Sequence, residues 1–369
     1  MPRVFLCGPW TDPQFLARIA GAGARADSAV LPEHILRQGA QGGLAHIVEQ
    51  AGHAVDGLVV DLDALAAARL SSLQAAFDAQ AVSCAVLVNG VSLAAQCYAP
   101  QNVPDGPDWQ ATDWSATKAA VMRDALCELA VLAETHPPDA LRARWPLALS
   151  HAASCLRARS EDAPAALRGD WGPDDVAPAR QNQPYAWFFA VREDDLRFRQ
   201  FDGSLSREVR RAAFVMSDAV TVLPYDPVRD RVLVIEQFRY GTWLRGARNP
   251  WLLEPIAGRV DPFETPEDAA LREAREEARL SLSADKLRPV GHVYPSPGAV
   301  TEFLYQYVAL CDLPDGAEGV AGLDSEAENI RSHLISFEQL MQLVCSGEVQ
   351  NGPLALASWW LAAHRAQMR

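Results

Sequence analysis

The sequence lacks several features that would place it in other classes of protein. No uninterrupted apolar run is long enough to cross a bilayer, and the start "MPRVFLCGPW" lacks the basic and then apolar layout of a signal peptide. Basic residues are few, since 33 Lys and Arg stand against 47 Asp and Glu, which gives a formal net charge of -14. Nucleic acids and anionic membranes bind clustered positive charge. We therefore expect a soluble, cytoplasmic protein that binds neither.

Cysteine motifs are missing as well. The seven cysteines are odd in number and scattered, and no two of them form a Cys-x-x-Cys pair. They are Cys7, Cys84, Cys97, Cys127, Cys155, Cys311 and Cys345. This pattern predicts free thiols in a reducing compartment, and it predicts no zinc site.

The chain of 369 residues is longer than one hydrophobic core usually supports, which predicts two domains. Short apolar runs such as "RVFLCG", "GLVVDL" and "CAVLVNG" alternate with helical stretches, so residues 1–105 should form a first domain of mixed α and β structure. Residues 106–180 should hold a helical segment, with one helix from Thr117 to Glu134, and a linker rich in Pro, Gly and Asp. Residues 181–369 should form the second domain, and the fold class is α/β.

The stretch "AGRVDPFETPEDAALREAREEARL", residues 257–280, concentrates acidic side chains. Thr265 is a good N-cap and is followed by Pro, which predicts that a helix begins there. At about 100° per residue, Glu273, Glu276 and Glu277 share one face of that helix. The helix therefore presents a row of carboxylates.

Such a row has two interpretations. Like charges four residues apart repel by about 0.2–0.5 kcal/mol per pair, and a divalent cation would reverse that sign. Mg²⁺ is a hard ion that accepts carboxylate oxygens, waters and substrate phosphates as ligands. The alternative is a solvated helix face with Glu and Arg pairs, which composition alone favours.

The spacing of the charged residues favours the metal. The fixed positions are Gly258, Glu264, Arg272, Glu273, Glu276 and Glu277. They resemble the signature of the Nudix hydrolase superfamily, G-x5-E-x7-R-E-U-x-E-E-x-G-U. Arg279 departs from it, because the family has Gly there. A left-handed residue other than Gly at a helix end costs on the order of 1 kcal/mol, but Arg279 is not a ligand position.

The resemblance continues outside this stretch. From about Asp195 to the C-terminus, "LPYDPVRDRVLVIEQFR", "PWLLEPIAGR" and "SPGAVTE" are similar to segments of the ADP-ribose pyrophosphatases of that superfamily. The resemblance implies an α/β/α sandwich around a mixed sheet and a homodimer. It also implies Mg²⁺-dependent hydrolysis, with Mn²⁺ as a possible substitute. The substrate would be ADP-ribose or a related nucleoside diphosphate sugar, and the products AMP and ribose 5-phosphate.

The resemblance also implies site residues. The metal ligands would be Ala257 through its carbonyl, Glu264, Glu273, Glu277 and Glu328. The catalytic residues would be Glu326, as the base that takes a proton from water, and Glu276 close to the metal. The substrate-binding residues would be Arg211, Arg239 and Glu302. Taken without the signature, the acidic residues near Glu326 would be an exposed loop, and the arginines would be surface ion pairs.

The N-terminal part resembles another family more distantly. "VFLCGPW" and "GLVVDL" are similar to V-F-x-Y-G-T-L and G-x-L-Y-D-L of the γ-glutamylcyclotransferase-like fold, a small α+β barrel with flanking helices. Phe77 stands about where active members have a glutamate, with Asp78 beside it. A Phe side chain cannot transfer protons, so we expect this domain to be inactive and to serve docking, dimer support or regulation. Two-domain Nudix proteins of similar arrangement carry a tellurite-resistance label, which implies no particular chemistry.

Two functions other than hydrolysis remain open from the sequence. The first is that of a sensor, which would bind ADP-ribose or another nucleotide without cleaving it. The presence of Glu273, Glu276, Glu277 and Glu326 favours the hydrolase. The second is activity of the N-terminal domain on γ-glutamyl compounds, and the missing glutamate counts against it.

Overall fold

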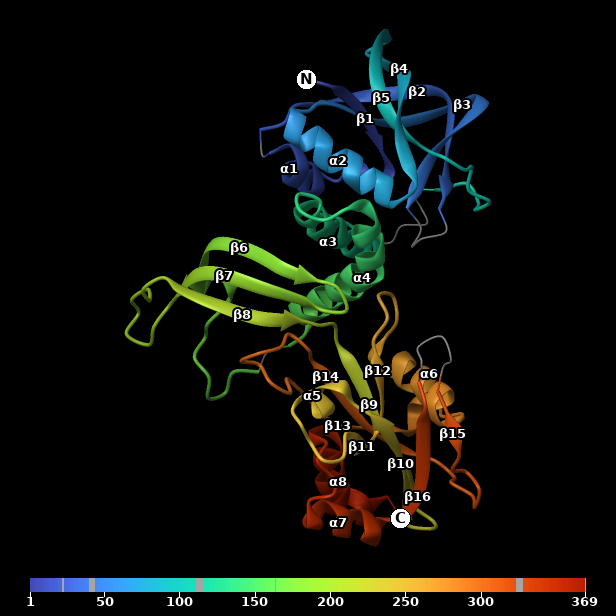
Figure 1. Ribbon diagram of the computed structural model, residues 1–369, viewed down its shortest axis with the longest axis vertical. Coiled ribbons are helices and arrows are strands. Elements are labelled where there is room, and N and C mark those ends of the chain that lie inside the picture. Colours follow the sequence, from blue (N-terminus) through green and yellow to red (C-terminus); the bar gives the residue numbers. More distant parts are fainter. Residues whose placement is uncertain (22, 40–43, 111–115, 163, 323–327, 369) are drawn as a thin grey trace. The chain divides into compact units, whose positions relative to one another are not determined.

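The computed structural model describes residues 1–369 except 22, 40–43, 111–115, 163, 323–327 and 369. It divides the chain into two compact units, Met1–Ala212 and Ala213–Arg369 (Figure 1). Each unit has its own secondary structure and its own core. Among the described residues, no helix is both long enough and apolar enough to span a membrane.

The first unit begins with a closed β-barrel. Its strands are β1 (Arg3–Cys7), β2 (Ala26–Gln38), β3 (Ala45–Asp61), β4 (Ala79–Val88) and β5 (Val91–Pro100), in the order β1-β3-β2-β4-β5. Apolar side chains such as Phe5, Leu31 and Val86 fill the interior. Helices α1 (Pro13–Ala20) and α2 (Ala64–Ala76) accompany the barrel. A barrel with flanking helices is the expected architecture, whereas its membership of the γ-glutamylcyclotransferase-like family stays a prediction.

A helical hairpin follows the barrel. It consists of α3 (Ala116–Leu132) and α4 (Pro138–Ser160), so the helix predicted from Thr117 to Glu134 is confirmed within two residues at its end. Leu126 and Leu129 of α3 and Leu141 and Trp145 of α4 are buried, as apolar residues three and four apart should be. The two helices pack against each other and against α1 and α2.

The stretch predicted as a linker is partly a strand. A three-stranded sheet of β6 (Val176–Ala186), β7 (Ala190–Phe198) and β8 (Val209–Val215) follows α4 and runs across the division between the units. Almost every side chain of β6 is exposed, so this strand has none of the alternation of burial that a strand usually shows in its sequence. Its composition of Pro, Asp and polar residues therefore predicts a linker and not a strand.

The second unit is built on one mixed sheet (Figure 1). Its strands are β9 (Ala219–Asp226), β10 (Arg231–Phe238), β11 (Trp251–Glu254), β12 (Ile256–Arg259), β13 (Leu287–Val293), β14 (Leu304–Leu310), β15 (Val320–Ala321) and β16 (Ile330–Ser336). They follow the order β13-β14-β9-β10-β16-β15, with β11 beside β10 and β12 beside β9. The pair β14 and β9 is parallel, whereas β10 is antiparallel to β9, β11 and β16.

Helices cover both faces of this sheet. They are α6 (Pro266–Ala278), α7 (Phe337–Ser346) and α8 (Gly352–His364). The short helix α5 (Tyr240–Leu244) follows β10 and has no buried residue. Along β10, Leu233 and Ile235 face the core that contains α6, while Val232 and Val234 face the core that contains α7 and α8. The expected α/β/α sandwich is confirmed.

Candidate active site

The acidic stretch forms a loop, a helix and a second loop. Helix α6 begins after Thr265, whose Oγ1 accepts a hydrogen bond of 3.1 Å from the N–H of Asp268. It ends at Arg279, which has φ 55° and ψ 26° in the left-handed region. This is the conformation for which the family signature has Gly, so the strained helix end expected at Arg279 is confirmed. Arg279 is the C-cap of the helix, and its backbone N–H donates to the carbonyl oxygens of Ala274 and Arg275.

Helix α6 separates its apolar residues from its acids. Ala269, Ala270 and Ala274 are fully buried against the sheet. Glu277 is also buried, with 3% of its surface exposed, whereas Glu273 and Glu276 are partly exposed. Buried carboxylates are rare in folded proteins unless another group compensates their charge.

Arg272 provides part of that compensation. Its Nε and Nη2 donate to the two carboxylate oxygens of Glu264 at 3.0 and 2.9 Å. Its Nη1 donates to Glu273 at 2.6 Å and to Glu276 at 3.2 Å, and Nη2 also donates to the carbonyl of Arg259 at 2.9 Å. One guanidinium therefore joins the loop before α6 to two carboxylates of the helix.

Gly258 makes this arrangement possible. A Cβ at residue 258 would lie 1.8 Å from Oε1 of Glu273 and 2.0 Å from its Cδ. Such distances are far shorter than any non-bonded contact, so any other residue at this position would displace the glutamate. The first glycine of the signature is thus explained by the close approach of the Glu273 side chain to the backbone of β12.

The surroundings of Glu273 and Glu277 disfavour their charged forms. The pKa of Glu273 is raised to about 7 and that of Glu277 to about 8, mainly by burial, and the neighbouring carboxylate of Glu328 contributes to both shifts. Arg272 acts against the shift at Glu273, and the N–H of Ala257, 3.0 Å from Oε2 of Glu277, acts against it there. Both carboxylates are therefore unfavourable as anions unless a cation joins them.

The donor set fits a hard divalent cation. Glu273, Glu277 and Glu328 influence one another electrostatically, and all offer oxygen ligands. Ala257 lies on β12 opposite Thr221, and its carbonyl remains a predicted ligand. Among the described residues, no group of three or more His, Cys, Asp or Glu side chains is arranged to hold a metal ion, and Arg272 and the Ala257 N–H donate hydrogen bonds to Glu273 and Glu277.

Arg239 lies beside these acids. It follows β10, and its Nε is 3.0 Å from both carboxylate oxygens of Glu254, a residue of β11 with 3% of its surface exposed. Burial lowers the pKa of Arg239, but Glu254, Glu277 and Glu328 together raise it above its usual value. The structure therefore brings Arg239 to the carboxylates of α6, with Glu254 holding its guanidinium.

The remaining predicted residues are distributed as follows. Glu302 belongs to the same neighbourhood, since burial raises its pKa while Arg239 acts against that shift. Arg211 lies on β8 in the first unit, where its Nη1 donates to the carbonyl of Arg210. Glu326 lies outside the described residues. The roles of all three stay predictions.

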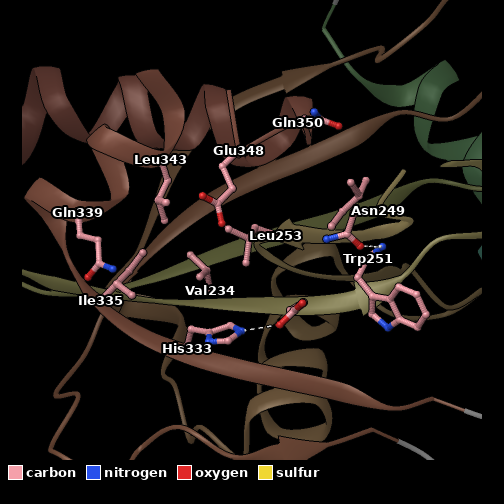
Figure 2. A pocket seen from close by; sticks show the side chains of 12 residues that line it. Val234, Asn249, Trp251, Leu253, His333, Ile335, Gln339, Leu343, Glu348 and Gln350 are labelled. Carbon is pink, nitrogen blue, oxygen red and sulfur yellow. Dashed lines mark hydrogen bonds and ion pairs between the residues drawn. The ribbon is translucent and has the colours of Figure 1, made fainter. Parts of the chain in front are cut away.

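A cavity of about 350 Å³ lies elsewhere in this unit (Figure 2). It is lined by Val234, Leu253 and Ile335 of the sheet, by Leu343 of α7 and by His333, whose Nε2 is 2.8 Å from Glu236. Val234 belongs to the face of the sheet that packs against α7 and α8, opposite to α6. A cavity is the usual first candidate for a site. Here we place the active site at α6, because the carboxylates with raised pKa values and the arginine lie there.

Comparisons with known proteins give the family of this site. The NUDIX domain model matches residues 216–352. The ADP-ribose pyrophosphatase of Escherichia coli strain K12 is 38% identical over 199 residues, which cover 54% of this chain and 93% of that protein. The chain belongs to the Nudix family. The resemblance inferred from the signature is therefore confirmed, and so is the enzyme class, a Nudix hydrolase.

Other Nudix relatives differ in their named substrates. The ADP-ribose pyrophosphatase of Haemophilus influenzae is 35% identical over 187 residues, covering 50% of this chain and 85% of that protein. The GDP-mannose pyrophosphatase of Enterobacter sp. strain 638 is 30% identical over 165 residues, covering 45% of this chain and 83% of that protein. The crystal structure of an ADP compounds hydrolase shares 21% identity with a TM-score of 0.39, and covers 53% of this chain and 98% of that one.

The sequence does not predict the contacts of two residues of the Nudix site. Arg272 is a fixed position of the signature, but its spacing does not indicate that its guanidinium binds three carboxylates. Glu254 stands in the quoted segment "PWLLEPIAGR", and its role as the partner of Arg239 depends on the pairing of β10 with β11. An acid at the end of an otherwise apolar strand was the available signal.

Proposed function

We propose that this protein hydrolyses the pyrophosphate bond of ADP-ribose, or of a related nucleoside diphosphate sugar, to AMP and ribose 5-phosphate. The observation that carries the proposal is the pair of carboxylates of Glu273 and Glu277, whose pKa values are both raised by burial, beside Arg239. A site that combines clustered acids with an arginine suits a diphosphate together with divalent cations. The similarity to named ADP-ribose pyrophosphatases supports the substrate class.

The metal is proposed to be Mg²⁺, with Mn²⁺ as a substitute. Its ligands would come from Glu273, Glu277, Glu328, Glu264 and the carbonyl of Ala257. When bound there, divalent ions neutralise negative charge on the diphosphate and lower the pKa of a bound water. Arg272 would then keep Glu264 and the helix together while the carboxylates turn to the ion, because it contacts the backbone of Arg259 as well.

The chain's other residues would bind the substrate and move the proton. Arg239 suits phosphate oxygens because its guanidinium is planar, and Glu254 fixes its orientation. Glu326 would take the proton from the attacking water, with Glu276 close to the metal as a second catalytic carboxylate. Arg211 and Glu302 would contact the phosphates and the ribose or adenosine.

A nucleotide panel tests the proposal directly. The purified protein is incubated with ADP-ribose, an ADP-hexose and GDP-mannose, with Mg²⁺, with Mn²⁺ or with EDTA, and nucleoside monophosphate release is measured. We expect AMP from ADP-ribose, no product with EDTA, and no turnover in Glu326→Gln. Preference for GDP-mannose would move the substrate assignment within the class, as the GDP-mannose pyrophosphatase relatives allow. ADP-ribose binding in a calorimeter without any AMP release would identify a sensor instead.

The first unit is proposed to be inactive toward γ-glutamyl compounds. Phe77 is buried and its ring packs edge-on against Trp10 and Trp145, with ring centroids 6.0 and 5.1 Å apart. Asp78 beside it is held by Arg142 through bonds of 2.8 and 2.6 Å. An aromatic cluster and a paired acid thus stand where that chemistry would need a free carboxylate. Release of 5-oxoproline from a γ-glutamyl dipeptide would refute this part of the proposal.

The remaining proposals concern organisation. We propose that residues 1–105, 106–180 and 181–369 act as barrel domain, helical connection and catalytic domain, that the protein is a cytoplasmic homodimer, and that it binds no nucleic acid or membrane. The scattered cysteines, which are all free in the structure, support a reducing compartment. Light scattering on the eluting peak of a size-exclusion column should give twice the mass of 40.1 kDa.

A further inference from the structure

A cysteine, a histidine and a glutamate form a chain of contacts in the helical hairpin of the first unit. The Sγ atom of Cys155 lies 3.4 Å from Nε2 of His151, and Nδ1 of the same ring lies 3.2 Å from Oε2 of Glu128. His151 and Cys155 are four residues apart on α4 and so share a face of that helix, while Glu128 comes from α3. None of these residues belongs to the Nudix site.

The glutamate at the end of this chain is fixed by further partners. Its other oxygen, Oε1, accepts hydrogen bonds of 2.9 Å from Nε of Arg144 and 3.2 Å from Nε2 of Gln183. The side chain of Arg144 is only 2% exposed, so its charge depends on Glu128. Glu128 therefore remains an anion aimed at the imidazole, and it orients the ring toward Cys155.

The order of the atoms identifies the chemistry. A metal ion would need the sulfur and the carboxylate to converge on one point, whereas here they bind opposite nitrogens of the ring. When Nδ1–H donates its hydrogen bond to Glu128, Nε2 presents a lone pair to the thiol, which is how a base activates a nucleophile. Although burial favours the neutral ring, the bonds to Cys155 and Glu128 raise the pKa of His151 to about 9, so the ring can hold a proton at neutral pH.

We propose that Cys155 is an activated thiol and a site of covalent modification by soft carbon electrophiles such as α,β-unsaturated carbonyl compounds. The thiol proton passes to Nε2 of His151, and the thiolate forms an S–C bond with the β carbon of the electrophile. The π electrons of the C=C bond move to the α carbon, which takes the proton back from the imidazolium. Nothing is oxidised or reduced, and no group leaves.

The position of Cys155 argues for modification rather than catalytic turnover. Acyl transfer needs backbone N–H groups directed at the developing oxyanion. Cys155 lies inside α4, which runs from Pro138 to Ser160, so the N–H groups around it are already used within the helix. Cys155 is partly exposed, which suits modification by a small reagent.

The charges around the site are the following. Glu128 and the outlying acid Asp124 come from α3, and Asp124 pairs with Arg123 of α3 and Arg159 of α4. Arg144 comes from α4, and the uncharged Gln183 comes from β6. These arginines are paired with acids, and the titratable base that contacts Sγ of Cys155 is His151.

Iodoacetamide is the probe that tests the proposal. The full-length protein is treated briefly at pH 7, and alkylation of each cysteine is followed by peptide mass spectrometry. We expect Cys155 to react about tenfold faster than Cys345, although Cys345 is more exposed, because a thiolate reacts and a thiol does not. Cys127 of α3 is an internal control that should hardly react, since burial raises its pKa to about 11.

A histidine variant separates activation from exposure. His151→Gln keeps a polar side chain of similar length, and it should slow Cys155 about tenfold at pH 7 while leaving the rate of Cys345 and the hydrolysis of ADP-ribose unchanged. Between pH 8 and pH 6 the rate at Cys155 should fall less steeply than the rate at Cys345 in the wild type, and equally steeply in the variant. The proposal is wrong if Cys155 reacts no faster than Cys345 in the folded wild type, or if His151→Gln leaves its rate unchanged with the circular dichroism spectrum intact.

Discussion

The two units of this protein each bury a glutamate, and they treat it in opposite ways. Glu128 in the helical hairpin has 11% of its side chain exposed, and Glu277 on α6 has 3% of its surface exposed. Burial alone would raise the pKa of both. At Glu128, His151 and Arg144 overcome that effect and lower the pKa to about 2, whereas at Glu277 the pKa rises to about 8.

The difference lies in the partners. Glu128 faces two basic side chains and an amide, so the fold itself supplies the compensation for its burial. Glu277 accepts a hydrogen bond from a backbone N–H, but the carboxylates of Glu273 and Glu328 repel it. The fold therefore does not compensate the negative charge of Glu277. The charge of the first acid is compensated within the fold, and we propose that the charge of the second is compensated by an external cation.

Replacing Glu277, the glutamate whose charge the fold does not compensate, should have the largest effect on function. We expect Glu277→Gln to lower kcat for ADP-ribose about a thousandfold, because the amide keeps the shape but loses the charge that would hold a divalent ion. Its stability without metal should not fall, since a buried charge in poor surroundings has been removed. Turnover assays and thermal melts with and without Mg²⁺ check both parts.

Glu338→Gln is the matched control for this variant. Glu338 is exposed on the first turn of α7, and its replacement should change neither kcat nor the melting temperature. Mg²⁺ should raise the melting temperature of the wild type and of this control but not of Glu277→Gln. Equal stabilisation of all three proteins by Mg²⁺ would show that Glu277 does not bind the ion.

Replacing Glu128, the glutamate whose charge the fold compensates, should lower stability and leave activity unchanged. Glu128→Gln leaves Arg144 buried without a counter-charge, and we expect it to cost about 3 kcal/mol in the free energy of unfolding. The hydrolase activity of the protein that remains folded should be unchanged, because Glu128 lies in the other unit. Urea denaturation measures the first quantity and kcat the second. A loss of activity at unchanged stability would contradict the distinction between the two glutamates.

A substitution at Gly258 tests whether the position of Glu273 matters beyond its charge. In Gly258→Ala the new methyl group would occupy the space of the Glu273 carboxylate, which can move away because it is the end of a flexible side chain. Stability should therefore change little, while kcat falls about a hundredfold through the misplaced carboxylate. Gly352→Ala is the control, since nothing lies within 4 Å of an added Cβ there.

Much of the fold could be predicted, because its segments follow simple periodic patterns. The helices over α3, α6, α7 and α8 have apolar residues three and four apart or clear capping signals, and the sandwich follows from the family signature. Strand β6 could not be found in this way. Its side chains are almost all exposed, so its sequence carries no trace of a buried face.

The site shows the same limit at the level of single residues. The signature located Glu273 and Glu277, because their spacing along a helix is fixed by the helix itself. It did not predict that Arg272 would reach back to Glu264, since a long side chain can join several faces. The pairing of Arg239 with Glu254 depends on strand register, which only the folded sheet determines.

The smallest predicted effect concerns pH. The pKa of His151 rises from 6.5 to about 9 on folding, so its contribution to stability is complete below pH 6.5 and is lost as the pH rises through 9. The pKa of Glu128 falls from 4.5 to about 2, so its contribution is complete above pH 4.5 and is lost as the pH falls through 2. Between pH 6.5 and 9 the wild type should lose on the order of 2 kcal/mol relative to His151→Gln, a value reduced for the partial exposure of the ring. Parallel curves of unfolding free energy against pH for these two proteins would mean that the imidazolium is not the partner that keeps Glu128 charged.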